Sequence, residues 1–304
     1  MSAAPRALLA AALATTLVPA IAPAAARAVE WSTRASVDGG YTSEVFPGYA
    51  GSTPDRFALV TAGTSARIRP LEALRLEWLA GVTAERYDRW QERDVERYET
   101  ELRARLGGWR LRARGRATPQ LMLYPDALGG ARYGGREGLL GLDWRFARAL
   151  VASLELRSDG QRYDELHAER TQVRTRWGYQ LAWEPRSDRR FAAQFENERA
   201  RADDPNYDFY DNQLTLAGGT RVGPVLARVE AAFGLRNYFP ASIFTSNYRR
   251  QDRAQAWRLE LRRDLGGPLT LVARDEYRRR DSTRRDRDYR VNTVGLALDW
   301  RLGR

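Results

Sequence analysis

The 304-residue chain has no cysteine, no lysine and only one histidine, His167. Without cysteine it has neither a disulfide framework nor a thiolate metal site. A single imidazole excludes a multi-histidine metal centre, and we expect no metal, no cofactor and no catalytic residue. The mean hydropathy of −0.59 excludes an ordinary helical membrane protein, because such proteins need stretches of about 20 apolar residues. What the chain has instead is 43% hydrophobic residues and 11% aromatic residues, too many for a disordered protein.

The first 28 residues predict an export signal. They combine an early Arg6, an apolar Ala- and Leu-rich stretch, and the pattern Ala26-Arg27-Ala28, which is typical of a signal-peptidase cleavage site. Pro19 and Pro23 disfavour a buried alanine-rich helix here. We therefore expect residues 1–28 to be a signal peptide and residues 29–304 to form the folded domain.

From residue 29 onward the dominant pattern is a strict alternation of apolar and polar residues. In 109–118, for example, Trp109, Leu111 and Ala113 alternate with arginines. Successive side chains of a strand point to opposite faces, so this period of two predicts β-strands. We predict 14 strands, at 31–42, 57–68, 73–86, 95–106, 109–118, 136–146, 150–158, 171–184, 189–199, 208–222, 225–236, 253–264, 269–279 and 289–302.

The connections between these segments alternate between short and long. Short ones fall near 69–72, 107–108, 147–149, 185–188, 223–224 and 265–268, and long ones near 43–56, 87–94, 119–135, 159–170, 200–207, 237–252 and 280–288. Aromatic residues gather at both ends. Trp31, Trp109, Trp144, Phe146, Trp183, Phe191 and Trp300 lie near the short connections, whereas Tyr41, Tyr87, Tyr98, Tyr163, Tyr207, Tyr210, Tyr238, Tyr277 and Tyr289 lie near the long ones. We interpret these as two interfacial girdles.

An even number of strands with alternating turns and loops is typical of bacterial outer-membrane barrels. Over residues 29–304 the chain resembles such barrels of the porin-like class. The resemblance implies an all-β, 14-stranded antiparallel up-and-down transmembrane β-barrel in the bacterial outer membrane, with both termini on the periplasmic side. A soluble β-sandwich or a β-propeller is the alternative, but 14 strands of one parity and the loop alternation disfavour both.

Both ends of the predicted barrel bear on its assembly and role. The segment Val37–Glu44, read as Val-Asp-Gly-Gly-Tyr-Thr-Ser-Glu, looks like the opening strand of proteobacterial barrels, some of them associated with exopolysaccharide secretion. That likeness implies polysaccharide export as one role. Barrels of the class usually end in an aromatic residue that the barrel assembly machinery reads, whereas this chain ends Leu298-Asp-Trp-Arg-Leu-Gly-Arg304. Trp300 and Leu302 nevertheless keep the outward parity.

Parity places more arginines than carboxylates on the inward face, and this predicts a cationic lumen. The turn Gly107-Gly108 sets a register. It places Arg105 opposite Arg110, Arg103 opposite Arg112, Glu101 opposite Arg114 and Glu99 opposite Arg116. Like charges placed opposite each other need neutralising groups, and Glu77 and Asp143 on the flanking strands are suitable. The ladder is then either a self-compensated wall or an anion site. The candidate constriction and anion-binding residues are Arg103, Arg105, Arg110, Arg112, Arg114, Arg116, Arg174 and Arg176.

Two further features have weaker interpretations. Asp275 has lipid-facing parity, so we expect a bulge or register change nearby. The Arg-rich segment 278–287 looks like a nucleic-acid patch in isolation, but in a barrel it is an outer loop exposed to solvent or to lipopolysaccharide phosphates, and we expect no nucleic-acid partner.

Three functional hypotheses follow. The first is a non-enzymatic channel that passes polar or anionic solutes, such as acidic oligo- or polysaccharides. The second is a non-conducting scaffold that partners a periplasmic or polysaccharide-secretion complex. The third is a barrel hydrolase that uses His167 with Ser153 or Ser158, which no residue spacing favours. The expected partners are outer-membrane lipids and lipopolysaccharide, the barrel assembly machinery and the solute itself.

Overall fold

The computed structural model describes residues 29–44, 53–121, 131–163, 165–186, 188–239, 250–283 and 287–303. The predicted signal peptide at 1–28 lies outside these residues. The same holds for residues 122–130 and 240–249, which belong to the predicted long connections 119–135 and 237–252. Among the described residues, no helix has the length and apolar character needed to cross a membrane.

Fourteen antiparallel strands make up almost all of the described chain and confirm the predicted segments. They are β1 (Glu30–Thr42), β2 (Asp55–Leu71), β3 (Leu74–Tyr87), β4 (Val95–Leu106), β5 (Trp109–Leu121), β6 (Ala131–Ala147), β7 (Leu150–Tyr163), β8 (Gln172–Arg186), β9 (Arg189–Ala202), β10 (Phe209–Val222), β11 (Val225–Tyr238), β12 (Gln251–Gly266), β13 (Leu269–Ser282) and β14 (Tyr289–Gly303). Several strands, such as β6 and β7, extend further toward the long connections than the alternation indicates. Both faces of a strand meet water there, so the apolar pattern ends before the hydrogen-bonded ladder does.

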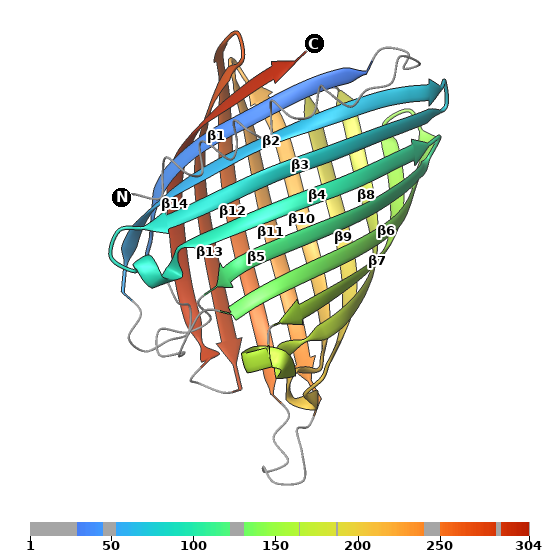
Figure 1. Ribbon diagram of the computed structural model, residues 1–304. Coiled ribbons are helices and arrows are strands. Elements are labelled where there is room, and N and C mark those ends of the chain that lie inside the picture. Colours follow the sequence, from blue (N-terminus) through green and yellow to red (C-terminus); the bar gives the residue numbers. More distant parts are fainter. Residues whose placement is uncertain are drawn as a thin grey trace.

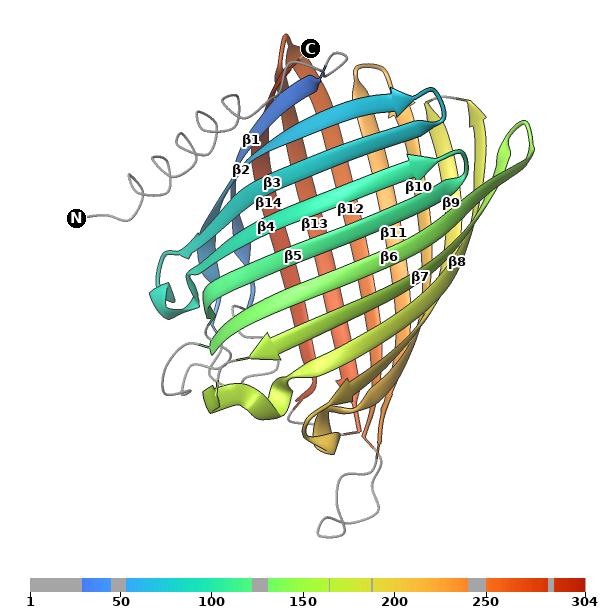
Figure 2. The ribbon, with the colours of Figure 1, turned by 45° about the vertical axis from the view of Figure 1, so that its right-hand side comes forward.

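The strands close into a single barrel in which each strand pairs with its neighbours in sequence and β1 pairs with β14. Figure 1 shows β2 to β6 running obliquely across the strands of the far wall, and Figure 2 shows the same inclination after a 45° turn. Tight turns join the strands at one end. The other end carries the long connections and the short 3-10 helices η2 (Gln91–Arg93), η3 (Glu165–Arg170) and η4 (Pro205–Tyr207). Closure leaves no unpaired strand edge.

The hairpin that joins β4 to β5 has the predicted register. Gly107 adopts φ 56°, a conformation that glycine takes without steric cost, and it lets β4 turn directly into β5. As a result Leu106 pairs with Trp109, and Arg105 pairs with Arg110. Since one hairpin register determines which residues face the lumen, the inward and outward sets follow from the sequence.

The outer surface is apolar. Large hydrophobic side chains are exposed around the barrel, among them Leu102, Leu154, Trp183, Leu296 and Trp300. All seven aromatic residues predicted for the periplasmic girdle are exposed there, namely Trp31, Trp109, Trp144, Phe146, Trp183, Phe191 and Trp300. An exterior of this kind is stable only against lipid hydrocarbon.

The structure contradicts the expected bulge or register change near Asp275. Its side chain is exposed on the outward face of β13, but pairing with Leu259 on β12 and Val294 on β14 continues unbroken through it. The register shift of β12 falls at Asp264 instead, beside the periplasmic turn. A bulge at residue 275 would move all following inward side chains of β13, including Arg278, to the lipid face. One lipid-facing carboxylate is the smaller cost.

An ion pair reinforces the seam where the barrel closes. Arg274 on β13 reaches over β14 and contacts the Asp38 carboxylate on β1 at 2.6 Å, and the Asp38 side chain is only 7% exposed. Gly295, the inward residue of β14 at this level, makes the reach possible. A Cβ added at residue 295 would lie 2.9 Å from the nearer Asp38 oxygen. The three strands that close the barrel are thus joined by a side-chain contact as well as by backbone pairing.

We therefore predict that Gly295→Val lowers the temperature at which the folded barrel unfolds. Crowding of the Arg274–Asp38 pair should cost about 2 kcal/mol. The measurement is the shift between folded and unfolded bands on SDS gels after heating. Gly138→Val is the matched control, because a Cβ there meets nothing within 4 Å. Equal unfolding temperatures for the two variants would contradict the role assigned to the seam.

Candidate functional site

The inner wall carries carboxylates and arginines paired between neighbouring strands. Glu101 on β4 contacts Arg103 on its own strand and Arg114 on β5, the latter at 2.8 Å, and its side chain is only 7% exposed. Arg116 contacts Glu99 at 2.6 Å. Both cross-strand ion pairs predicted from the Gly107 turn are therefore present. Their charge-assisted hydrogen bonds hold the arginine side chains against the wall.

Below these pairs the same register sets arginine opposite arginine, as predicted. The structure supplies the neutralising groups. Asp143 on β6 lies 3.0 Å from Arg110 and 3.5 Å from Arg105, and Glu77 on β3 lies 3.5 Å from Arg103. The sequence predicted both carboxylates as neutralising groups, because they face inward on the flanking strands at a similar height in the barrel. The partner of Arg112 was not expected, and it is Glu137 on β6.

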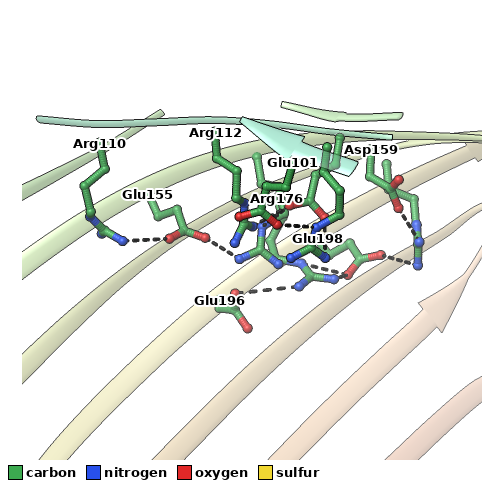
Figure 3. A network of polar contacts seen from close by, with 12 residues as sticks. Glu101, Arg110, Arg112, Glu155, Asp159, Arg176, Glu196 and Glu198 are labelled. Carbon is green, nitrogen blue, oxygen red and sulfur yellow. Dashed lines mark hydrogen bonds and ion pairs between the residues drawn. The ribbon is translucent and has the colours of Figure 1, made fainter. Parts of the chain in front are cut away.

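The pairs connect into a network that crosses the lumen wall from β4 to β9 (Figure 3). Arg110 contacts Glu155 on β7 at 3.6 Å, and Glu155 contacts Arg157 on its own strand. Further along, Arg176 on β8 donates to Glu198 on β9 at 3.0 Å. Arg174, next to it on β8, contacts Asp159 and lies 3.7 Å from Glu198. All eight arginines predicted to line the constriction thus face the lumen and have carboxylate partners.

At the periplasmic end of this wall, Arg75 and Arg105 are less neutralised than the arginines above them. Arg75, Arg105 and Arg110 form one row across β3, β4 and β5, and they border a cavity of about 380 Å³ together with Arg103 and Arg112. The Arg105 side chain is 57% exposed and forms an ion pair with Asp143. Within the described ranges no ion pair is found for Arg75. Arg75 was absent from the predicted site because the row exists only once β3 pairs with β4.

The opposite wall of the lumen has few charges and small side chains. Its inward residues at mid-height on β9 to β12 include Ala192, Gln194, Thr215, Ala217, Ala232, Gly234, Ala254 and Ala256, and the carboxylates Glu196 and Glu230 lie in the same cross-strand rows. A cavity of about 740 Å³ lies along the periplasmic half of this wall, and one of about 200 Å³ along the extracellular half. Thr215 lines the larger cavity and its cross-strand partner Ala232 the smaller, so the two adjoin. We call the eight uncharged residues the small-residue strip.

Arginines border the strip at both ends. Arg190, Arg221 and Arg228 line the periplasmic cavity, and Arg228, with a 57% exposed side chain, lies 3.8 Å from Glu260. At the extracellular end the cavity is bordered by Arg236 and Arg280. Carboxylates line the same two cavities, Glu230 and Glu260 at the periplasmic end and Asp211 and Asp252 at the extracellular end, so solutes approaching the strip pass both guanidinium groups and carboxylates.

Four tyrosines predicted for the extracellular girdle face the lumen instead, namely Tyr87, Tyr163, Tyr238 and Tyr289. Arg280 stacks on Tyr289 at 5.0 Å, and Arg250 stacks on Tyr238 at 4.2 Å. The prediction was wrong for these four because their position near the long connections was used without their parity. Tyr41, Tyr98 and Tyr277 are exposed on the outside, as predicted.

The predicted loop at 278–287 is also corrected. Residues 278–282 belong to β13, so Arg278 and Arg280 face the lumen, where Arg278 contacts Glu276. Arg279 faces outward and contacts Asp281 at 2.9 Å. Residues 284–286 lie outside the described part of the chain. The cluster that looked basic in the sequence is thus divided between the two faces of one strand.

The residues of the hydrolase hypothesis do not converge in the described region. Ser153 faces the lumen and donates to Asp143 at 2.8 Å, whereas Ser158 has outward parity on the same strand. His167 belongs to η3, and its side chain lies outside the description. No group of three or more potential metal ligands occurs in the residues that the structure describes.

No protein-family profile matches the chain, and no curated protein matches it. Among solved structures it is similar to OmpT, an outer membrane protein of Vibrio cholerae. The in-vitro folded trimer form gives a TM-score of 0.54 at 7% identity, over 91% of this chain and 100% of that chain. The loop L8 deletion mutant gives 0.53 at 7% identity, over 90% and 99%.

At this identity the likeness shows the fold alone. Together with the closed barrel and the lipid-compatible exterior, it identifies the chain as an outer-membrane β-barrel that resides in the bacterial outer membrane.

The like-charged row predicts the effect of Asp143→Asn. Arg105 would then lose its carboxylate contact and Arg110 would keep only Glu155, so the free energy of unfolding should fall by about 1 kcal/mol, a modest amount because these groups are partly exposed. Urea unfolding in detergent measures the change, and Arg105→Gln in the same background should restore part of it.

Asp264→Asn is the matched control, because Asp264 accepts a hydrogen bond from Thr270 as Asp143 does from Ser153. If both aspartate variants lost the same stability, Asp143 would have no special role in neutralising the arginines.

Proposed function

We propose that this barrel is a passive outer-membrane channel for polar, anionic solutes. The observation that carries the proposal is the small-residue strip, a stretch of lumen wall made mostly of small uncharged side chains, with open volume beside it and arginines as well as carboxylates at both ends. Long ion-paired side chains occupy the wall from β4 to β9, so open volume remains along β9 to β12. Passage along it requires no catalytic group.

Electrostatics supplies the selectivity in this proposal. An anion entering the lumen loses part of its hydration, and guanidinium groups replace the lost contacts through paired hydrogen bonds to carboxylate, phosphate or sulfate. Arg221 supports this reading, because no carboxylate contact to it is found within the described ranges. Among such solutes we include acidic oligo- and polysaccharides, which carry carboxylates at regular intervals.

The ion-pair network supports a second candidate function. A wall this fully paired is rigid, and a barrel whose lumen is closed by it would act as a non-conducting scaffold for a periplasmic or polysaccharide-secretion complex. In either case we propose that residues 1–28 direct export and that the barrel assembly machinery inserts the chain. Lipopolysaccharide and other outer-membrane lipids are its proposed surroundings.

Conductance separates the two functions. We expect purified protein in planar bilayers to give discrete channel openings, with a reversal potential under a KCl gradient that shows preference for chloride. The triple variant Arg190→Glu, Arg221→Glu, Arg228→Glu should shift the reversal potential toward potassium. An absence of openings would favour the scaffold, and cation preference in the natural sequence would refute the electrostatic mechanism.

The route can be tested separately, because the chain has no cysteine of its own. We expect Ala217→Cys and Ala232→Cys channels to lose conductance when a charged methanethiosulfonate reagent is added, since both residues lie on the strip. Leu139→Cys, on a buried residue of the ion-paired wall, and Ala152→Cys, on the lipid face, should lose little. Equal effects at all four positions would mean that solutes do not follow the strip.

A further inference from the structure

The outer wall of β8 to β10 changes from apolar to cationic toward the long connections. The cross-strand rows show this change. Tyr179, Phe195 and Leu214 form one row, and Trp177, Asn197 and Asn212 form the next. Above them lie Thr175, Arg199 and Tyr210, and then Val173 beside Arg201. Such a gradient marks the passage from hydrocarbon to headgroups, so these two arginines lie at headgroup depth in the outer leaflet.

A groove of about 750 Å³ runs along these rows, lined by Val173, Thr175, Trp177, Asn197, Arg199 and Tyr210. On the neighbouring strand the partner of Val173 is Gly160, where an added Cβ would meet nothing within 4 Å. The lower end of the groove is apolar, because the Trp177 ring packs on Phe195 at 5.8 Å. The groove thus has an apolar end toward the membrane centre and a cationic end toward the outer surface.

The two arginines differ from those in the lumen. In the described part of the chain neither Arg199 nor Arg201 contacts a carboxylate, whereas the eight predicted constriction arginines all do. Arg199 stacks over the Tyr210 ring at 5.2 Å, and its Nε atom is buried without a hydrogen-bond partner among the described residues. One acid, Asp203, lies at the rim of the groove. Guanidinium groups at headgroup depth that contact no carboxylate of the described residues are suited to a phosphate.

We propose that this groove binds one phosphate-bearing lipid of the outer leaflet. The lipid phosphate lies between Arg199 and Arg201, and an acyl chain lies along Thr175, Trp177 and Phe195. The combination of these guanidinium groups and the apolar groove below them carries the inference. It does not depend on conduction through the lumen, so it stands or falls independently of the channel proposal.

Native mass spectrometry of the detergent-purified full chain tests the site. The probes are dioleoyl phosphatidic acid, dioleoyl phosphatidylcholine and inorganic phosphate. We expect the protein to retain one phosphatidic acid at concentrations where phosphatidylcholine has dissociated. The double variant Arg199→Gln, Arg201→Gln should require about tenfold more phosphatidic acid for the same occupancy, whereas Arg199→Lys, Arg201→Lys should stay close to the natural protein.

Arg253→Gln, Arg290→Gln is the matched control, because both residues are exposed outward-facing arginines near the same end of other strands. Its affinity for phosphatidic acid should be unchanged, and heat-dependent gel migration should show that every variant is folded. Unchanged affinity in the Arg199→Gln, Arg201→Gln variant would overturn the proposal. So would equal retention of phosphatidylcholine by the natural protein. Complete displacement of phosphatidic acid by an equal concentration of inorganic phosphate would show a site for the free anion and would equally overturn it.

Discussion

The structure depends on one interaction: a charged side chain turned into a narrow closed barrel is stabilised by an opposite charge on the same wall, and most of the inward arginines described above have one. Side chains alternate strictly between lumen and lipid, so an inward arginine cannot rotate out to the exterior. Neighbouring strands therefore supply the carboxylates. Glu101 binds arginines on two strands, and Asp143 separates two guanidinium groups that the hairpin places face to face. The same rule holds at the seam, where Arg274 reaches Asp38 across a glycine.

This pairing of charges divides the lumen into two unlike walls. Long arginine and glutamate side chains fill the space next to β4 to β9 (Figure 3), whereas alanine, glycine and threonine leave space next to β9 to β12. A fourteen-stranded barrel is intermediate between filled eight-stranded barrels and open sixteen-stranded porins. In this barrel the ion-paired side chains occupy part of the lumen cross-section. The open part of the lumen lies beside the small-residue strip.

The exterior obeys the complementary rule, because lipid hydrocarbon offers no partner for a charge. Arginines appear on the outward face near the strand ends, where headgroups replace hydrocarbon, as Arg199 and Arg201 do. Asp275 is the exception: its carboxylate faces lipid at mid-strand, and the unbroken register of β13 keeps it there. A bulge that moved Asp275 inward would turn the following inward residues of β13, such as Arg278, toward the lipid. The free-energy cost of one lipid-facing carboxylate is smaller than the cost of that change.

The sequence by itself determined the strands, their parity and the pairing across the β4–β5 hairpin, because all three depend on residues close together in the chain. The pairing of Glu99 and Glu101 with β5 followed from the Gly107 turn in this way. The tertiary structure decided what depends on several strands at once: the Arg75 row, the contact of Arg112 with Glu137, the small-residue strip and the closing seam. It also decided which face the upper tyrosines occupy. Near the long connections both faces of a strand meet polar surroundings, so an amphipathic ring fits either one and only the completed register distinguishes them.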